Sequence, residues 1–331
     1  MAGASAPSLS AAIANAGGLG ACGVLLMPPD EIDAWAREVR AQSNGNFQLN
    51  QWIPDPPPPR DSEHEARVRA FLAQWGPAVP PETGDVALPN FEAQSEALLA
   101  IRPRAASSVM GLYPPEFVAK LKQRGISWFA TISTLAEARA AEAAGADAIV
   151  AQGMEAGGHR ACFDAANAER QLVGLFSLLP AVVDAVRVPV VAAGGIADAR
   201  GVVAALALGA SAVQIGTGFL RCPEAKIHPA WASALARTAP EETIVSRVFS
   251  GRAGRSIVTD YVRAALAARA PEPAPYPVQR GLTAAMRSGA QKSGDVQRMQ
   301  AWAGQSASFA QAIPAGELVQ RIWEGVRAIL A

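Results

Sequence analysis

Two glycine-rich turns follow two apolar runs of the chain, and both have the composition of anion-binding loops. The run VPVVAAGG ends in Gly194 and Gly195, and the run SAVQIGTGF contains Gly216 and Thr217. Glycine lets the backbone approach a ligand closely, and exposed N–H groups before a helix donate to an anion. The Thr217 hydroxyl adds a further donor. Either turn alone is as compatible with a simple tight turn, but the pair favours a phosphate site without a Walker motif.

A histidine follows a third apolar run, in the stretch DAIVAQGMEAGGHR. The near-neutral intrinsic pKa of histidine suits a general base or a hydrogen-bond donor, and this residue is His159. Gly157 and Gly158 before it would let the loop pass close to a flat ligand. A lone histidine after two glycines is also compatible with a purely structural loop residue. Its place beside Gln152, at the end of a predicted strand, favours a functional role.

Other polar residues give weaker signals. Asn50 ends the run FQLN, where its amide could donate to and accept from a heterocycle, although a turn-forming asparagine would look the same. Arg252 and Arg255 in SGRAGR are expected to be solvated, as are His64 and His228. Three dispersed histidines without carboxylates at ligand spacing predict that no metal is bound.

The scaffold must bring these strand ends together. Apolar runs alternate with alanine-rich helical stretches, which is the pattern of parallel βα units. Thr134 and Glu137 have capping-box spacing, and Asp198 is expected to begin a second helix. The last helix is expected to pack through the apolar stripe Leu318, Ile322, Val326 and Ile329. The predicted strands are residues 18–23, 47–52, 106–111, 126–133, 147–153, 188–195 and 211–219.

Seven strands are one fewer than a closed (β/α)8 barrel needs. The helix expected at SLSAAIANAGG should follow a first strand, yet only Met1 to Pro7 precede it. We therefore predict an α/β TIM barrel with its first strand truncated. A doubly wound open sheet is the alternative, but no GxGxxG fingerprint follows an early strand. In such barrels the active-site residues lie at the carboxyl ends of the strands, and phosphate commonly binds after strands seven and eight.

Two segments interrupt the alternation of strands and helices. A polar excursion opening at DPPPPR is expected to fold over the barrel as a long loop, with a short helix capped at Asp61 or Ser62. Residues 222–300 are expected to form a small helical insertion, as a lid or substrate-side domain. The barrel would then comprise residues 1–221 and 301–331.

Composition limits the class of protein. The 331 residues, half of them hydrophobic, can form a large α/β domain with a sizeable core. The 29 basic and 29 acidic side chains give zero net charge, which argues against nucleic acid or an anionic membrane as the main partner. Three cysteines without CxxC spacing, no apolar run of roughly 18–20 residues and no signal sequence predict a soluble cytoplasmic protein.

Several of these stretches together resemble one family. QGMEAGGHR, AAGGIADARGVVAALALGASAVQIGTGFL, SGRAGR and WAGQ look like motifs of nitronate monooxygenases, formerly called 2-nitropropane dioxygenases. The resemblance runs from Met1 through the C-terminal helix. It implies a (β/α)8 barrel with a smaller helical domain, non-covalent FMN, and oxidation of nitronates by O2 to a carbonyl compound and nitrite. Members usually begin with a strand ending in PMAG, whereas this sequence starts at the methionine of that motif.

The resemblance also implies roles for residues. Gly194, Gly195, Gly216 and Thr217 would hold the FMN phosphate, and His159 would face the reactive edge of the flavin as the catalytic residue. The other residues that it brings to the cofactor are Asn50, Gln152, Gly157, Gly158 and Gln214. The expected partners are a small nitronate and O2, and a homodimer is the expected assembly.

Two other functions stay open. An FMN-dependent enoyl-acyl carrier protein reductase using NAD(P)H shares the EAGGH and AAGGI segments, but AERQLVGLFSLLPAVVDAV and the proline-rich excursion favour the monooxygenase. A flavin-free barrel that only binds a phosphorylated metabolite, without activity, is the alternative from another class. The insertion at 222–300 is expected to set any preference for chain length.

Overall fold

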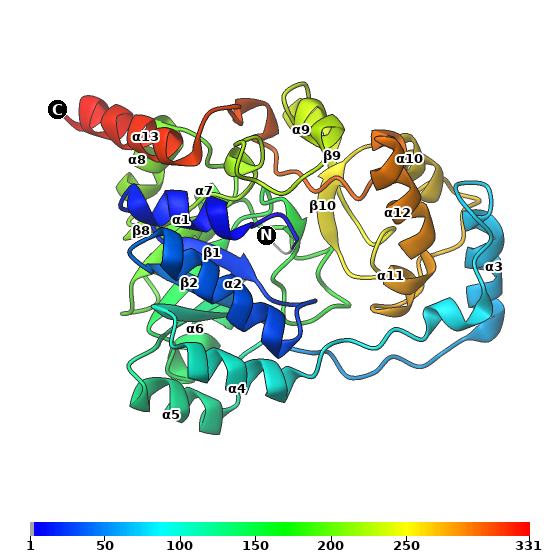
Figure 1. Cartoon of the computed structure of the whole chain (residues 1–331), viewed down its shortest axis with the longest axis horizontal. Coiled ribbons are helices and arrows are strands. Elements are labelled where there is room, and N and C mark those ends of the chain that lie inside the picture. Colours follow the sequence, from blue (N-terminus) through cyan, green and yellow to red (C-terminus); the bar gives the residue numbers. More distant parts are fainter. Residues whose placement is uncertain (1–2) are drawn as a thin grey trace.

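A seven-stranded parallel sheet forms the centre of the computed structural model, which describes residues 3–331 (Figure 1). Met1, where the family motif begins, lies outside the described residues. The strands are β1 (Gly20–Gly23), β2 (Phe47–Trp52), β3 (Ala105–Val109), β4 (Ser127–Ile132), β5 (Ala148–Gln152), β7 (Val190–Ala193) and β8 (Ala212–Gln214). All seven predicted strands are present, and β1 and β8 are the two edges of the sheet among the described residues.

The sheet is curled, as the predicted TIM-barrel architecture requires. The order is β1-β2-β3-β4-β5-β7-β8, so β2 and β8 stand near opposite edges. Nevertheless, Nε2 of Gln48 in β2 donates to Oε1 of Gln214 in β8 over 3.2 Å. Such a contact is possible only if the sheet bends round on itself. The carboxyl ends of its strands therefore converge on one space.

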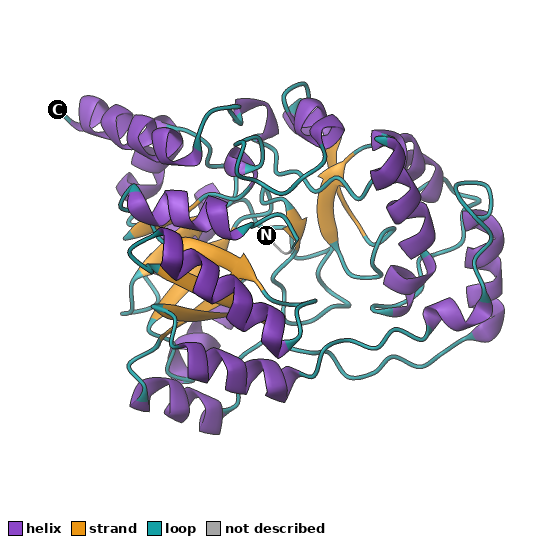
Figure 2. Ribbon diagram, viewed as in Figure 1, coloured by secondary structure: helices purple, strands orange, loops and turns teal. Residues whose placement is uncertain are grey.

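Helices cover the outside of the sheet (Figure 2). They are α1 (Pro7–Asn15), α2 (Pro29–Gln42), α4 (Phe91–Ile101), α5 (Pro115–Gln123), α6 (Leu135–Ala143), α7 (Leu175–Val183), α8 (Ala199–Ala207) and α13 (Ala315–Leu330). The capping box of Thr134 and Glu137 at α6 is confirmed, as is Asp198 as the N-cap of α8. Both strand faces are covered, which explains why Phe47, Leu49 and other strand side chains are fully buried.

The C-terminal helix α13 packs against α8 and α1. The predicted stripe is correct for Leu318 and Val326, which are buried, and for Ile322, which packs on the core. It is wrong for Ile329, whose side chain is 51% exposed near the end of the helix. Among residues 3–331, no helix combines the length and apolarity needed to cross a membrane.

The segment 222–300 contains strands as well as helices. Its helices are α9 (Pro229–Leu235), α10 (Asp260–Ala265), α11 (Val278–Leu282) and α12 (Ala284–Ser293). Its strands β9 (Thr243–Ser246) and β10 (Gly254–Ile257) form an antiparallel sheet with β6 (Gly158–His159), in the order β6-β10-β9. Gly254 pairs with His159, so this second sheet ties the segment to the functional end of the barrel.

The second sheet corrects the expectation that Arg252 and Arg255 are solvated. Their exposed fractions are only 1% and 5%. Arg252 forms an ion pair with Asp55 and donates to the carbonyl of Cys162 over 2.6 Å. Arg255 donates to the carbonyls of Met154 and Thr243. Buried arginine is tolerated here because loop carbonyls and one carboxylate replace water as hydrogen-bond acceptors.

The polar excursion forms α3 (Ser62–Leu72) and a 3-10 turn, η1 (Pro81–Gly84). Asp61 accepts from the N–H of His64 over 2.9 Å, which confirms it as the N-cap. The prediction that the excursion folds over the barrel is wrong for α3, whereas Leu88, near the end of the excursion, packs against Trp52 and Met110 at the ends of barrel strands. Figure 1 shows α3 beside α11, on the far side of the segment 222–300. Its apolar residues Val68 and Leu72 are buried in one cluster with Tyr261 and Met286.

Candidate active site

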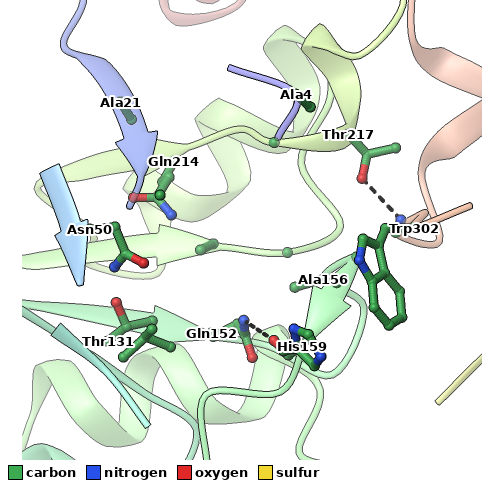
Figure 3. A pocket seen from close by; sticks show the side chains of 18 of the residues that line it. Ala4, Ala21, Asn50, Thr131, Gln152, Ala156, His159, Gln214, Thr217 and Trp302 are labelled. Carbon is green, nitrogen blue, oxygen red and sulfur yellow. Dashed lines mark hydrogen bonds between the residues drawn. The ribbon is translucent and has the colours of Figure 1, made fainter. Parts of the chain in front are cut away.

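A cavity of about 440 Å³ lies at the carboxyl ends of the sheet strands (Figure 3). Each of the seven strands contributes to its wall, through Cys22, Asn50, Ser107, Thr131, Gln152, Ala193 and Gln214, among others. Its volume is in the range of pockets for small ligands or cofactors, and its position is that of active sites in parallel barrels.

The structure brings all ten site residues predicted from the sequence to this one cavity. They are Asn50, Gln152, Gly157, Gly158, His159, Gly194, Gly195, Gln214, Gly216 and Thr217. Sequence reasoning missed other lining residues, among them four large side chains: Trp52, Arg280, Arg287 and Trp302. Trp302 stands in WAGQ, so that motif was the available signal, whereas the two arginines lie in helices without a distinctive pattern. Among residues 3–331, no three histidine, cysteine or acidic side chains are grouped to hold a metal.

The two glycine-rich turns present unused backbone donors. Gly194 and Gly195 have φ values of 106° and 71°, in the left-handed region that glycine tolerates. The N–H groups of Gly195, Gly216 and Thr217 donate to no acceptor within the described residues. Gly195 is exposed, and Gly216 and Thr217 are partly exposed, so these N–H groups are accessible to a ligand in the cavity. An anion bound between the ends of β7 and β8 would accept hydrogen bonds from them.

The chain segment before α13 ties the two turns together. Oγ1 of Thr217 accepts from the N–H of Gly304 over 3.0 Å, and Oγ of Ser306 donates to the carbonyl of Gly195 over 2.6 Å. A Cβ atom at Gly157 would lie 2.5 Å from the nitrogen of Gly304. Only glycine at position 157 allows the backbone to pack this closely against Gly304, independently of any role in binding a ligand.

The amide side chains of Asn50 and Gln214 are each held by one hydrogen bond within the protein, and each keeps an amide atom free to bond a ligand. Nδ2 of Asn50 donates to Oγ of Ser107 over 2.9 Å, which leaves Oδ1 as an acceptor. Oε1 of Gln214 accepts from Gln48, which leaves its amino group as a donor. In Figure 3 both side chains point into the space between the strands. This arrangement offers a donor and an acceptor to a heterocycle.

Gln152 shapes the loop that carries His159. Its Nε2 donates to the carbonyl of His159 over 3.1 Å, and its Oε1 accepts from the N–H of Ala161 over 2.9 Å. Arg160, fully buried, donates to the carbonyls of Gln152 and Gly153. One remaining N–H of the Gln152 amide is available to the cavity. Hydrogen bonds from the side chains of Gln152 and Arg160 thus fix the loop, in place of backbone hydrogen bonds of a β-sheet.

His159 is surrounded by aromatic rings. The ring centroids of Trp52 and Trp302 each lie 4.9 Å from that of the imidazole. Burial, together with the positive charges of Arg252 and Arg280, lowers the pKa of His159 to about 3. The imidazole is therefore neutral near pH 7, and one of its nitrogens is free to accept a proton.

Ser250 determines which imidazole nitrogen that is. Its Oγ lies 2.8 Å from Nε2 of His159 and donates to the carbonyl of Arg252 over 3.1 Å. We assign the hydroxyl proton to that carbonyl, and with this assignment the hydroxyl accepts from Nε2–H. Nδ1 is consequently the unprotonated nitrogen, and it has no hydrogen-bond partner within residues 3–331. Nδ1 is the atom of His159 that can act on a ligand.

Two arginines from the segment 222–300 reach the cavity. Arg287 donates to Thr283, Gln300 and the carbonyl of Arg280, and burial lowers its pKa to about 10. The guanidinium of Arg280 makes no hydrogen bond or ion pair within the described chain, and burial lowers its pKa. Because no carboxylate or hydrogen-bond acceptor of the described chain is paired with this cation, an anionic ligand beside it would be favourable.

Fold and cavity together define an enzyme of the parallel β/α-barrel class. The family model described as nitronate monooxygenase matches residues 1–325. A nitronate monooxygenase of Paraburkholderia phytofirmans is 39% identical over 330 residues, which cover 97% of this chain and 89% of the relative. The chain belongs to the nitronate monooxygenase family and is an oxidoreductase.

Solved structures agree with this assignment. Nitroalkane oxidase from Streptomyces ansochromogenes superposes with a TM-score of 0.90 at 34% identity, over 99% of this chain and 95% of that one. FabK from Thermotoga maritima superposes with a TM-score of 0.74 at 26% identity, over 99% and 90% of the two chains. The fold is thus shared with both, and the likeness to the nitroalkane oxidase is the greater.

Proposed function

We propose that this protein uses FMN and O2 to oxidise alkyl nitronates to a carbonyl compound and nitrite. One observation carries the proposal: His159, whose Nδ1 has no hydrogen-bond partner within residues 3–331, lines the same cavity as the unpaired guanidinium of Arg280 and the free N–H groups of two turns. Membership of the nitronate monooxygenase family supports it.

The residues present fit FMN. Gly194, Gly195, Gly216 and Thr217 would hold the phosphate, because their turns combine free donors with backbone close to the cavity. Asn50, Gln152, Gly157, Gly158 and Gln214 would border the flavin ring. When bound, FMN supplies the redox chemistry, and the protein supplies placement and polarity.

His159 would act differently on the two forms of the substrate. From a neutral nitroalkane, Nδ1 would take the proton on the carbon next to the nitro group. On a nitronate, already deprotonated, the imidazole would only orient the anion. A bound anion would also raise the pKa of His159 above its value in the empty cavity, because opposite charge stabilises imidazolium.

Arg280 supports a nitronate over a thioester substrate. Its guanidinium is unpaired within the described chain and gains most from a ligand that carries negative charge. A nitronate is an anion with two oxygens, which suits a guanidinium. The reacting part of an enoyl thioester has no such charge.

The enoyl reductase remains the second candidate because of the likeness to FabK. It is the weaker candidate, since the nitroalkane oxidase superposes more closely and is more similar in sequence. The inactive metabolite-binding barrel is the third candidate.

One series of measurements separates the three candidates. Protein loaded with FMN should release nitrite from ethyl nitronate in air, and should reduce slowly when mixed with NADH without oxygen. Rapid bleaching by NADH without nitrite release would favour the reductase. Failure to take up flavin at excess FMN would favour the metabolite-binding barrel.

The proposal also covers the roles of the two domains, the cellular location and the oligomeric state. We assign cofactor binding to residues 1–221 and 301–331, and the substrate side to residues 222–300, which contribute Arg280 and Arg287 to the cavity. A cytoplasmic location is supported by three cysteines that are all free and buried. A homodimer completes the proposal, and sedimentation of the purified protein tests it.

A further inference from the structure

A second cavity, of about 540 Å³, adjoins the first. Leu25 and Trp52 line both cavities. The wall of the second consists of the proline-rich stretch 54–58, the returning stretch 84–89 and residues 276–278. Most of these side chains are proline, valine, leucine or aromatic, so the space is suited to an apolar group.

The charged side chains on this wall are already paired. Asp55 pairs with Arg252, and Arg60 pairs with both Asp85 and Glu65. Gln94, the polar amide on the wall, donates to the carbonyls at positions 24 and 27. No charged group on this wall therefore lacks a partner within residues 3–331. This differs from the first cavity, where Arg280 is unpaired.

The two cavities are separated by a stack of aromatic rings. The centroid of Trp52 lies 4.9 Å from that of His159 on one side and 4.8 Å from that of Tyr276 on the other. Tyr276 lines the second cavity, and Arg280, four residues further along the chain, lines the first. Because Leu25 and Trp52 belong to both walls, a ligand with its charged end near His159 and Arg280 would have to pass these two side chains to enter the second cavity.

We propose that the second cavity binds the alkyl tail of aliphatic nitronates, whose anionic head lies between His159 and Arg280. This inference rests on the proposed function and names its substrate class: nitronates with chains of about six carbons or more. The polar excursion, expected from the sequence to cover the barrel, instead supplies the walls of this tail site. Specificity for length would come from the stretches 54–58 and 84–89 together with Tyr276.

The test compares kcat/KM for ethyl, butyl, hexyl and octyl nitronates. Each buried methylene contributes up to about fourfold, so we expect kcat/KM to rise at least tenfold from ethyl to hexyl nitronate. Ala87 is an exposed residue on the wall of the tail site, so Ala87→Trp adds an indole there. It should abolish the rise and leave ethyl nitronate within twofold of the original value. Ala66→Trp, exposed on α3 in the same excursion, is the matched control and should behave like the unaltered protein.

A binding measurement separates failure of the tail site from failure of the proposed function. Calorimetric titration with propanoate and octanoate, which do not react, should give tighter binding of octanoate, lost in Ala87→Trp. Equal kcat/KM for all nitronates, or equal loss on short and long ones in Ala87→Trp, would overturn the tail site. If no nitronate of any length is oxidised while octanoate still binds more tightly, the proposed function fails and the tail site stands.

Discussion

Nε2 of His159 lies 2.8 Å from Oγ of Ser250, and the same Oγ lies 3.1 Å from the carbonyl oxygen of Arg252, to which we assign the hydroxyl proton. This relationship assigns the proton to Nε2 and leaves Nδ1 as the basic nitrogen. His159 lies in the short strand β6, after β5, and Ser250 lies between β9 and β10, so the pairing depends on two residues 91 positions apart. The chemistry of the barrel is thus oriented by the second sheet.

Ser250→Ala should slow turnover of neutral nitroalkanes about tenfold, because the imidazole loses the bond that fixes its tautomer and orientation. Nitronates, which need no proton removed, should be affected less. Steady-state kcat/KM for nitroethane and for ethyl nitronate measures the difference. Ser246→Ala is a matched control, since Ser246 is also buried but its Oγ makes no hydrogen bond within the described chain. Equal behaviour of the two variants would contradict the role of Ser250.

His159→Asn should keep FMN bound and slow turnover of neutral nitroalkanes by about 10²–10⁴-fold, the usual contribution of a general base. Turnover of nitronates should fall far less, because the proton is already gone. Absorbance of bound flavin checks that the site is intact. A loss of the same size on both substrates would rule out proton abstraction by His159.

Arg280→Met should raise KM for nitronates and lower kcat/KM about ten- to a hundredfold, since a charge-assisted bond contributes about 1.5–3 kcal/mol. Neutral nitroalkanes should be less affected at the binding step. Arg263→Met on α10, an exposed arginine paired with Asp260, is the control and should change neither value. If Arg280→Met binds nitronates as well as the unaltered protein, the anion site lies elsewhere.

The low pKa of His159 predicts an acid-sensitive fold. Its pKa is about 3 in the native state against an ordinary value of 6.5, so between these pH values the unfolded chain binds a proton that the native chain does not. The free energy of unfolding should therefore decrease as pH falls from 6.5 toward 3, by at most about 1.4 kcal/mol per pH unit from this residue.

Urea denaturation of the FMN-free protein at pH 7, 6, 5 and 4.5 measures this dependence. His159→Asn should flatten the slope, whatever its effect on absolute stability. An unchanged slope in the variant would mean that other groups cause the acid sensitivity.

Gly195→Ala should weaken FMN binding, because the left-handed backbone that presents the free N–H would be strained. A Cβ there meets only ordinary contacts with Glu155, so strain and not collision is the cause. Gly125→Ala is the control: Gly125 has a φ of 67°, close to the 71° of Gly195, and lies after α5. Both variants should lose about 1 kcal/mol or more of stability, but only Gly195→Ala should lose FMN affinity.

Local patterns were sufficient to predict the barrel elements, His159 and the two glycine-rich turns, and the family resemblance supplied the remaining site residues, such as Gln214. The strands are continuous apolar runs, and caps such as Thr134 and Asp198 mark helix ends independently of the rest of the chain. Strand ends converge in any parallel barrel, so His159 and the two turns had to meet.

Features that depend on distant pairing were not predictable in this way. β10 is a strand because it pairs with β9 and β6, and Arg252 is buried because Asp55, far away in sequence, supplies its counter-charge. Arg280 lines the cavity only because the segment 222–300 packs against the barrel. A single sequence gives no sign of such contacts when the residues themselves look like ordinary core or surface.

Phosphate recognition by the two glycine-rich turns is tested by comparing the binding of FMN and riboflavin, which differ only in the phosphate. Fluorescence titration of the full chain with each should give at least a hundredfold lower Kd for FMN, because the turns at Gly194–Gly195 and Gly216–Thr217 hold the phosphate. Equal affinity for the two flavins, or no uptake of either, would show that these turns do not bind the FMN phosphate.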